Sequence, residues 1–318
     1  MKFGAMLSDS SAYWADKMSD NTLLKHLEDL SILRFSFGPS DFSQSDYKWG
    51  DRKKHLVAPE EQLKMNVLAR ITKLTNGRLM LVAAPWSPPR RLVNRSRSHT
   101  EDDLDEPVKN WNDHYAEVLC AWVDLYHNHG IDIDYLSLQN EPMLKTSDYP
   151  SNCMSALEAA ELRKALYREN SNIKVALYDH NPDSSGIEFV KTLIKESAVA
   201  PGDISAWHMY AGNIQDIMEI ESIKNGTLGV MVTEVGSSAH EDYDRALRWH
   251  TEKVKAAQAV GCTHYMYHNL FLDKDGAPHM RQSEDYVSQP LFTVEYDPVI
   301  EEAVVTSTWA AMEAFKSV

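Results

Sequence analysis

Two glutamates each stand at the end of a short apolar segment, a position from which a carboxyl group can act on a bound molecule. Glu141 ends the run Leu136-Ser-Leu-Gln-Asn-Glu, and Glu234 ends the run Val230-Met-Val-Thr-Glu. Because the two glutamates are far apart in the sequence, only tertiary folding can bring them together. Two carboxyl groups can supply the proton donor and the nucleophile that cleavage of a glycosidic bond requires, and a separation of roughly 5–5.5 Å favours direct attack with retention of configuration. Neighbouring carboxyl groups repel when both are ionised, so we expect one of them to keep its proton near neutral pH.

Short β-rich runs alternate along the chain with longer segments of helical period. The strand candidates are Lys2–Met6, Ile32–Phe37, Leu79–Ala83, Tyr135–Leu138, Lys174–Tyr178, Ala206–Met209, Gly229–Thr233 and Thr263–Tyr267. The helix candidates are Leu23–Leu30, Pro59–Thr72, Trp111–His127, Ser155–Arg168, Gly186–Lys195, Gln215–Glu221, Asp242–Ala259 and Ser307–Lys316. This α/β alternation predicts a closed (β/α)8 TIM barrel that spans residues 1–318 as a single catalytic domain. An open doubly wound sheet is the alternative, but no G-x-G-x-x-G pattern follows the first strand, where its dinucleotide-binding form places one.

In a (β/α)8 barrel the loops that follow the strands carry the chemistry. Polar and aromatic residues gather at these positions in this sequence, whereas the opposite strand ends read as plain turns such as Asn76-Gly77. The candidates in chain order are Asp41, Trp86, Asn140, Glu141, Asp179, His180, His208, Glu234 and His268. We therefore expect a site at the carboxyl-terminal mouth of the barrel.

The charge of the chain narrows the classes of partner. Its 318 residues include 47 acidic and 32 basic ones, which gives a formal net charge of −15. Without a block rich in Lys or Arg, this balance argues against a protein that grips nucleic-acid phosphates or anionic membranes. Three scattered cysteines argue against a disulfide framework. The first residues turn polar too early for a signal peptide, and no apolar run approaches the ~20 residues of a membrane span, so we expect a cytoplasmic protein.

The two glutamates and the segments around them resemble the clan A glycoside hydrolases, and most closely glycoside hydrolase family 30, the glucosylceramidase-like family. The segments that carry the resemblance are Phe3-Gly-Ala-Met-Leu-Ser-Asp-Ser-Ser-Ala, Leu33-Arg-Phe-Ser-Phe-Gly-Pro-Ser-Asp-Phe-Ser, Ala83-Ala-Pro-Trp-Ser-Pro-Pro, Asn140-Glu-Pro, Ala206-Trp-His-Met-Tyr and Asn269-Leu-Phe-Leu-Asp-Lys-Asp-Gly-Ala-Pro. They occur in family order over nearly the whole chain, which makes the resemblance specific. It implies a retaining β-glycoside hydrolase on a (β/α)8 barrel, with a carbohydrate substrate and no cofactor.

The resemblance implies a role for each matching residue. Glu141 would be the general acid/base and Glu234 the nucleophile, while Asn140 would hydrogen-bond the sugar 2-hydroxyl group. Arg34 and Tyr210 would hold Glu234 ionised and oriented, because a cation lowers the pKa of a neighbouring carboxyl group. The subsite nearest the cleaved bond would be lined by Asp41, Trp86 and His208.

Two features depart from the family pattern. His268 stands before Asn269 where the family usually has Trp, so we expect a more polar sugar-binding wall, which argues against glucosylceramide as the substrate. The chain also starts at the first barrel strand and ends soon after the last helix, so we expect the family's β-sandwich side domain to be missing. A second copy of the chain is then expected to cover the apolar residues of the terminal segment, which are Val304, Val305, Trp309 and Met312.

Two alternative functions stay open at this level. A zinc hydrolase is conceivable because histidines lie near several strand ends, namely His180, His208, His240, His264 and His268. No H-E-x-x-H pattern supports zinc, and we expect no metal. The other alternative is a non-catalytic carbohydrate-binding barrel, in which His268 and the missing side domain reflect abandoned chemistry.

The sugar, the linkage and the choice between exo and endo action depend on loops whose contacts the sequence does not reveal. The relevant loops are Arg90–Glu106, Met143–Asn152 and Asp273–Gln289. Of these, Arg90–Glu106 is long, polar and mixed in charge, so we expect it to form a mobile loop over the substrate cleft.

Overall fold

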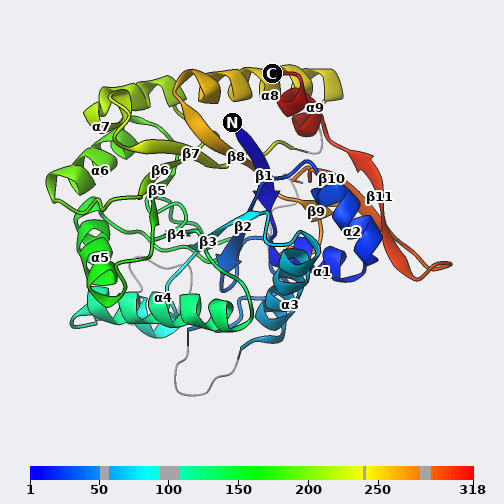
Figure 1. The fold of residues 1–318 in the computed structure, drawn as a ribbon, viewed down its shortest axis with the longest axis horizontal. Coiled ribbons are helices and arrows are strands. Elements are labelled where there is room, and N and C mark those ends of the chain that lie inside the picture. Colours follow the sequence, from blue (N-terminus) through cyan, green and yellow to red (C-terminus); the bar gives the residue numbers. More distant parts are fainter. Residues whose placement is uncertain (51–56, 94–107, 239–240, 280–287) are drawn as a thin grey trace.

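The computed structural model describes residues 1–50, 57–93, 108–238, 241–279 and 288–318. Within these ranges eight parallel strands close into a barrel in chain order, and the last strand pairs with the first (Figure 1). The strands are β1 (Lys2–Met6), β2 (Ile32–Phe37), β3 (Met80–Pro85), β4 (Tyr135–Ser137), β5 (Val175–His180), β6 (Ile204–His208), β7 (Gly229–Glu234) and β8 (Cys262–Tyr267). Each overlaps a strand predicted from the sequence, and the predicted (β/α)8 barrel is confirmed.

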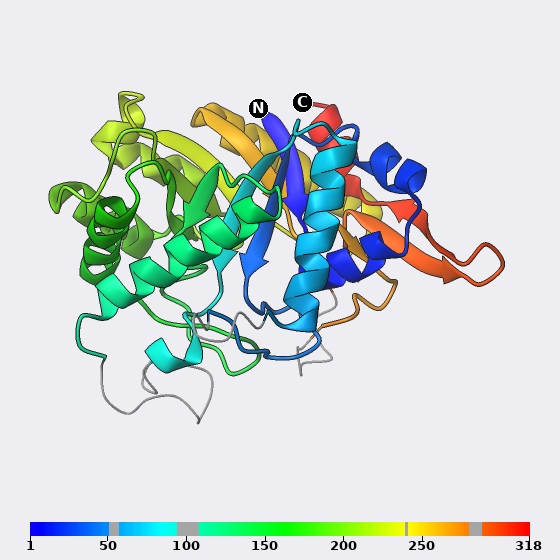
Figure 2. The same ribbon diagram turned by 60° about the horizontal axis from the view of Figure 1, so that its bottom comes forward.

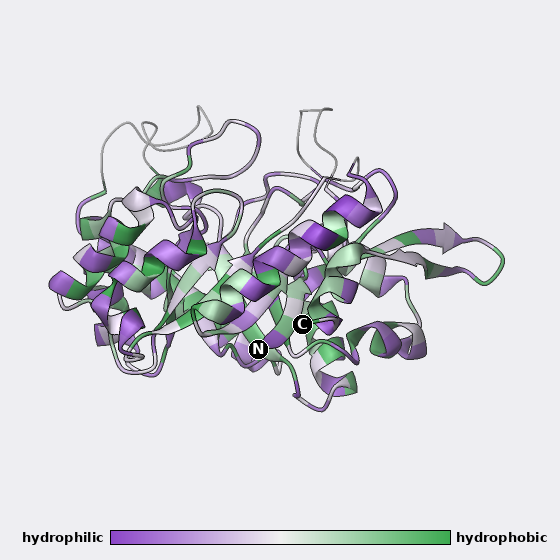
Figure 3. Cartoon of the chain, turned by 90° about the horizontal axis from the view of Figure 1, so that it is seen from above, coloured by the Kyte–Doolittle hydropathy of each residue, from purple (hydrophilic) through white to green (hydrophobic). Residues whose placement is uncertain are grey.

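Helices connect the strands and surround the barrel (Figure 1). They are α1 (Asp9–Asp16), α2 (Asp20–Leu27), α3 (Pro59–Leu74), α4 (Trp111–Asn128), α5 (Ala156–Glu169), α6 (Ser184–Lys195), α7 (Glu221–Lys224), α8 (Tyr243–Ala259) and α9 (Ala310–Lys316), with 3-10 turns η1 (Arg90–Leu92) and η2 (Ile214–Glu219). Figure 3 shows hydrophilic and hydrophobic residues alternating along the outer helices, as expected for helices with one face on the barrel and one in water. Within the described ranges, none of these helices has the length and apolarity needed to cross a bilayer.

Alternation along the strands divides the core into an inner and an outer part. On β2, Leu33 and Phe35 point outward into the large cluster between strands and helices, whereas Ile32 points inward. The inner cluster consists of Ile32, Val82, Ala176, Ile204, Ala206, Met231 and Met266. Because period-two alternation sends every second side chain to the same face, Arg34 follows Ile32 toward the barrel axis, one step nearer the mouth.

The last part of the chain adds a small sheet beside the barrel. Its strands are β9 (Phe271–Leu272), β10 (Phe292–Asp297) and β11 (Glu302–Thr308), in the order β11-β10-β9. The β10–β11 hairpin projects from the body of the molecule (Figures 1 and 2). The helix predicted over Ser307–Lys316 was therefore wrong at its start, because Ser307 and Thr308 pair with β10 and the helix begins at Ala310.

Part of the apolar terminal segment is covered by the chain itself. Met312 is buried, and the ring of Trp309 packs edge-on against Tyr243 with 5.5 Å between ring centroids. Val304 and Val305 are half-buried on β11. In-chain packing thus removes part of the surface that was expected to need a partner, and the homo-oligomer stays a prediction.

A buried ionic cluster ties helix α3 to helix α1. The Lys64 ammonium group lies 2.8 Å from Asp9 Oδ1 and 3.1 Å from Glu61 Oε2, and all three residues are buried. Burial disfavours the charged form of Lys64, but the two carboxylates outweigh this and raise its pKa. The hydroxyl group of Tyr126 on α4 also donates to Glu61, at 2.6 Å, so the cluster joins three helices.

Candidate active site

A cavity opens at the carboxyl-terminal end of the barrel. The arrowheads of β1 and β2 point to the lower end of the barrel in Figure 2, and the cavity lies at this end. Its volume is about 350 Å³, and its walls are Asp41, Phe42, Trp86, Asn140, Glu141, Leu144, Tyr149, His180, Asn181, Tyr210, Glu234, His268 and Ser288. Residues from the ends of at least five strands thus meet in one place, as the sequence analysis expected.

Irregularities in the strands turn polar side chains toward the barrel axis. The β5–β6 register shifts after Tyr178, where Tyr178 and Asp179 adopt left-handed φ angles of 80° and 58°. Tyr178 consequently packs in the outer core while Asp179 contacts Arg34 inside the barrel. The β6–β7 register also shifts, just before the point where His208 pairs with Glu234. Such bulges are a common means of re-aiming side chains next to active sites.

Arg34 joins the side chains at the floor of the cavity. Its Nη1 donates to Glu234 Oε2 at 2.7 Å, and its Nη2 donates to Asn140 Oδ1 at 2.6 Å and Asp179 Oδ2 at 2.9 Å. Burial disfavours the guanidinium charge, but Asp179 and Glu234 outweigh this and raise the pKa of Arg34. Burial alone would raise the pKa of Asp179, yet the Arg34 charge and hydrogen bonds hold it well below its usual range.

Tyr210 holds the second oxygen of Glu234. Its hydroxyl group donates to Glu234 Oε1 at 2.9 Å, and the Asn181 side-chain oxygen fixes the Tyr210 backbone by accepting from its N–H at 3.0 Å. Gly236 permits this approach, because a Cβ there would lie 2.9 Å from the His268 carbonyl oxygen and 3.4 Å from the Tyr210 hydroxyl oxygen. The two carboxylate oxygens of Glu234 are therefore fixed by Arg34 on β2 and by Tyr210 in the loop that follows β6.

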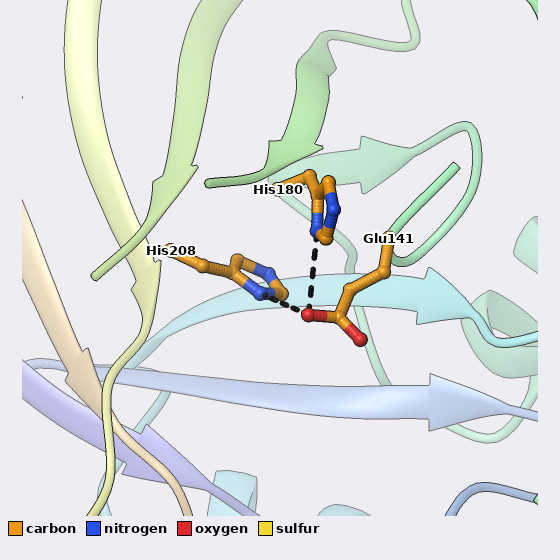
Figure 4. Close-up of side chains that lie close together, drawn as sticks. All are labelled: Glu141, His180 and His208. Atoms are coloured by element: carbon orange, nitrogen blue, oxygen red, sulfur yellow. Dashed lines mark hydrogen bonds and ion pairs between the residues drawn. The ribbon is translucent and has the colours of Figure 1, made fainter. Parts of the chain in front are cut away.

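Two histidine rings converge on Glu141 (Figure 4). Nδ1 of His208 lies 3.2 Å and Nδ1 of His180 lies 3.3 Å from the same oxygen, Glu141 Oε1. The backbone of Glu141 adopts a left-handed φ of 46°, and in this conformation its carboxyl group points toward the two rings. Nε2 of His208 lies 3.2 Å from Asp179 Oδ1 and 3.7 Å from Glu234 Oε2. Glu141 and Glu234 thus lie on either side of one imidazole ring.

The histidines change which group carries a proton in the ligand-free site. Burial disfavours ionisation of Glu141, but the neighbouring His180 and His208 rings outweigh it, so the pKa of Glu141 lies below its ordinary value. Burial also disfavours the charged His208 ring, but the carboxylates of Glu234, Asp179 and Glu141 raise the pKa of His208 to about 10. The lowered pKa of Glu141 thus runs against the expectation that this carboxyl group keeps its proton in the ligand-free site, and the raised pKa of His208 favours the protonated ring.

Aromatic and acidic side chains form the opposite wall of the cavity. The Trp86 and His268 rings stack with 6.4 Å between centroids and an interplanar angle of 23°. His268 Nε2 lies 3.4 Å from Asp41 Oδ2, and the Arg34 guanidinium lies 4.8 Å from the Trp86 ring centroid. A flat apolar face beside a carboxylate suits a sugar, which presents both C–H faces and hydroxyl groups.

The structure brings every predicted site residue to this region, but in two layers. Asp41, Trp86, Asn140, Glu141, Tyr210, Glu234 and His268 line the cavity. His208 was expected to line the subsite and Arg34 to hold Glu234, and both are fully buried beneath the lining residues. Their donors are directed at Glu234, Asn140, Asp179 and Glu141, so they position other side chains rather than form the wall.

The sequence analysis placed Asp179 and His180 among the residues at the barrel mouth but assigned neither of them a role in the site. Asp179 is fully buried and contacts Arg34, His208 and the Thr233 hydroxyl group, the last at 2.5 Å. The signal was present, because Asp179 and His180 follow a predicted strand as Glu141 and Glu234 do. What the sequence lacked was the bulge that turns Asp179 inward.

The histidines that suggested a zinc site do not all lie in the same part of the structure. His264 pairs in register with Lys2 at the start of β1, so it lies at the opposite end of the barrel from His268. His240 lies outside the described residues, as do residues 94–107 of the predicted loop over the cleft and residues 280–287 of another. Within the described ranges, the group that could hold a metal ion is Glu141, His180 and His208, whose ligand atoms all lie within 4.8 Å of one another.

The chain is similar in sequence and in fold to known glycoside hydrolases. The chain is 25% identical over 252 residues to an endo-1,6-β-D-glucanase of Trichoderma harzianum, with 67% of this chain and 49% of the relative covered. It is 27% identical over 346 residues to the putative glucosylceramidase 3 of Caenorhabditis elegans, with 91% and 64% covered. The solved structure of an endo-β-1,6-glucanase superposes with a TM-score of 0.80 at 20% identity, over 99% of this chain and 74% of that one, which supports the fold.

The family assignment rests on a match to the model of a protein family. The chain spans 49%, 42% and 37% of the length of three endo-1,6-β-D-glucanases that it resembles, so these relatives contain sequence beyond the matched part. Residues 1–189 match the glycosyl hydrolase family 30 TIM-barrel domain. That stretch runs from β1 through β5 and includes Arg34, Asn140 and Glu141. The chain therefore belongs to glycosyl hydrolase family 30.

Proposed function

We propose that the chain is a retaining β-glycoside hydrolase in which Glu234 is the nucleophile and Glu141 the general acid/base. The observation that carries the proposal is the placement of both carboxyl groups on the cavity wall, on either side of His208. This reaction needs two carboxyl groups, one as acid/base and one as nucleophile, beside a cavity that can hold a sugar.

The first step uses the fixed carboxylate of Glu234. One of its oxygens attacks the anomeric carbon, the glycosidic C–O bond breaks, and the departing oxygen takes a proton from Glu141. Arg34 and Tyr210 orient the Glu234 oxygens, at 2.7 Å and 2.9 Å, so that little reorganisation is needed before attack. In the second step water attacks the same carbon, Glu141 takes its proton, and the ester bond to Glu234 breaks.

Glu141 needs a proton in the first step, whereas the ligand-free site favours its ionised form. A sugar in the cavity removes water from Glu141, and this desolvation raises the pKa of a carboxyl group. The proton source lies next to it, because His208 Nδ1 is 3.2 Å from Glu141 Oε1. The second step requires an ionised Glu141, which is the form that the ligand-free site favours.

A β-1,6-linked glucan is the proposed substrate. Three endo-1,6-β-D-glucanases are among the similar proteins, and a solved endo-β-1,6-glucanase shares the fold. The Trp86 ring with its stacked His268 offers one sugar face an apolar surface, while Asp41 offers a hydroxyl group an acceptor.

The test is hydrolysis of a β-1,6-glucan, followed by NMR of the anomeric proton of the first product. We expect turnover with the β-anomer formed first, and we expect Glu234→Ala to abolish it. Azide should restore Glu234→Ala on an activated aryl β-glucoside and yield the α-glycosyl azide, because azide replaces the missing nucleophile. Full activity in Glu234→Ala would refute the assignment, and binding without turnover in the wild type would favour the non-catalytic carbohydrate-binding barrel.

A further inference from the structure

The approach of two histidines to one oxygen of Glu141 exceeds what a general acid/base requires. Hydrolysis by a carboxylate pair needs Glu141 to exchange one proton. A single neighbouring ring, that of His208, is sufficient to assist this exchange. His180 adds a second ring nitrogen at 3.3 Å, contributed by the end of β5. We propose that Glu141, His180 and His208 form a binding site for a divalent transition-metal ion such as Zn²⁺, and that the bound ion blocks the hydrolytic site.

The distances suit a tetrahedral ion. Zinc binds imidazole nitrogen and carboxylate oxygen at roughly 2.0–2.2 Å, which places neighbouring ligand atoms about 3.3–3.5 Å apart on a tetrahedron. Glu141 Oε1 lies 3.2 Å from His208 Nδ1 and 3.3 Å from His180 Nδ1. The two nitrogens are within 4.8 Å of each other, and Figure 4 shows both rings on the same side of the carboxylate. The His180 side chain is 12% exposed on the cavity wall, so a small rotation of its ring closes the remaining gap.

His208 is held in the orientation of a metal ligand. Its Nε2 lies 3.2 Å from Asp179 Oδ1, and Asp179 is held in turn by Arg34. A carboxylate that accepts from one ring nitrogen leaves the lone pair of the other nitrogen free for a metal, and such pairs are typical of histidine ligands. The ring therefore presents Nδ1 toward Glu141, and this nitrogen becomes a ligand atom once the incoming ion displaces its proton.

The charge of the region favours a cation. Four carboxylates surround the floor and wall of the cavity, from Asp41, Glu141, Asp179 and Glu234, and the buried cation among them is Arg34. Binding of the ion displaces the proton of the His208 ring, and with both imidazole rings then neutral a divalent ion brings the local charge nearer to balance. Three protein ligands leave a fourth tetrahedral position, which faces the cavity and can hold water.

Occupancy of this site is incompatible with the chemistry assigned to Glu141. The ion would bind the same oxygen, Oε1, that lies between the two rings, and its positive charge would keep Glu141 ionised, so this carboxyl group could not supply the proton that the first step needs. This inhibitory part rests on the proposed function, whereas binding of the ion does not.

Calorimetric titration of the whole chain with ZnCl₂, in a buffer that does not chelate metals, tests the binding. We expect one Zn²⁺ per chain in the wild type and at least about a tenfold weaker affinity in His180→Gln. The matched control is His127→Gln, which removes an exposed histidine 2.6 Å from Asp132 that could also attract zinc. Wild-type affinity in His127→Gln is expected. Equal loss in both variants, or loss in His127→Gln alone, would overturn the site.

Two further measurements separate binding from inhibition and from misfolding. Thermal unfolding with and without ZnCl₂ should show a higher midpoint for the wild type and no gain for His180→Gln. Should that variant not fold, Co²⁺ added to the wild type should give the visible absorption of a tetrahedral complex, and its absence would contradict the site. Zinc should suppress hydrolysis reversibly, with recovery on adding EDTA. Zinc that binds through His180 without slowing turnover would refute the inhibitory part alone.

Discussion

Arg34 on β2 and Glu234 on β7 form a buried ion pair across the mouth of the barrel, with 2.7 Å between Nη1 and Oε2. The same guanidinium group binds Asp179 at 2.9 Å, so one cation serves two carboxylates. Because burial makes an unpaired charge costly, the position of each partner depends on the others. Arg34 thus fixes one oxygen of the candidate nucleophile from beneath the cavity, while Tyr210 fixes the other from the cavity wall.

Replacing the guanidinium group with an ammonium group should impair catalysis more than folding. In Arg34→Lys a single nitrogen cannot reach Glu234, Asn140 and Asp179 together, so we expect kcat to fall by roughly 10²–10³-fold. Steady-state kinetics on an aryl β-glucoside measures this. The control is Arg163→Lys, since Arg163 forms an equally buried pair with Asp203, at 2.9 Å, outside the cavity wall. Similar kcat losses in both variants would indicate a general effect of buried arginines instead.

The leaving group should decide how severely Glu141→Gln is impaired. We expect kcat/KM to fall by about 10²–10⁴-fold for an alkyl or sugar leaving group, which needs protonation. For a dinitrophenyl leaving group the first step should be nearly unaffected, because that group departs without a proton. A series of aryl β-glucosides measures the dependence, with exposed Glu169→Gln as the control. Equal losses for all leaving groups would remove Glu141 from the role of acid.

The raised pKa of His208 predicts a loss of stability at alkaline pH. Its pKa rises from 6.5 to about 10 on folding, so the folded state binds the proton more tightly than the unfolded state does. The resulting stabilisation is fully present below about pH 6.5 and is lost as the pH rises toward about 10. One such group changes the free energy of unfolding by at most about 1.4 kcal/mol per pH unit.

Urea unfolding across this range, for the wild type and His208→Gln, measures the effect. The difference in unfolding free energy between the two proteins should shrink as the pH rises, because only the wild type loses the contribution of His208. A difference that stays constant from neutral to alkaline pH would contradict the raised pKa.

The buried cluster of Lys64, Asp9 and Glu61 should contribute to the stability of the fold and have no direct part in catalysis. Lys64→Met leaves Asp9 and Glu61 buried without their cation, and breaking a buried ion pair in this way costs about 3–5 kcal/mol. Chemical denaturation measures the loss. The control is Lys274→Met, whose side chain is 83% exposed and pairs with Asp275, so its denaturation midpoint should stay that of the wild type. Equal midpoints for both variants would show that the cluster contributes little.

The barrel was predictable because its signals are local. Each strand is short and apolar and is followed by a helix of clear period, and those patterns alone imply parallel βα units. Helix α1 was missed because Asp9, Ser10 and Ser11 look like a polar loop. These residues are buried by partners distant in sequence, such as Lys64 and the Phe271 carbonyl group. The β10–β11 hairpin was missed for a similar reason, since β10 pairs with β9 as well as with its neighbour.

The candidate site was predictable in its membership and not in its electrostatics. Position after a strand, together with the family resemblance, pointed to Glu141, Glu234 and Arg34. The bulge that turns Asp179 inward has no evident sequence signal, and the φ angle of 58° at that residue arises from the fold. The protonation pattern could not be predicted either, because it depends on ring nitrogens a few ångströms from Glu141.

The contact between Glu141 and the His208 ring makes the titrations of these two groups inseparable. Any gain or loss of charge on Glu141 alters the proton affinity of His208, and the reverse holds too. An apparent ionisation constant read from a bell-shaped rate profile therefore belongs to the pair and not to either side chain. A substitution at one member would shift the apparent constant of the other, so a limb of such a profile cannot be ascribed to one side chain from that profile alone.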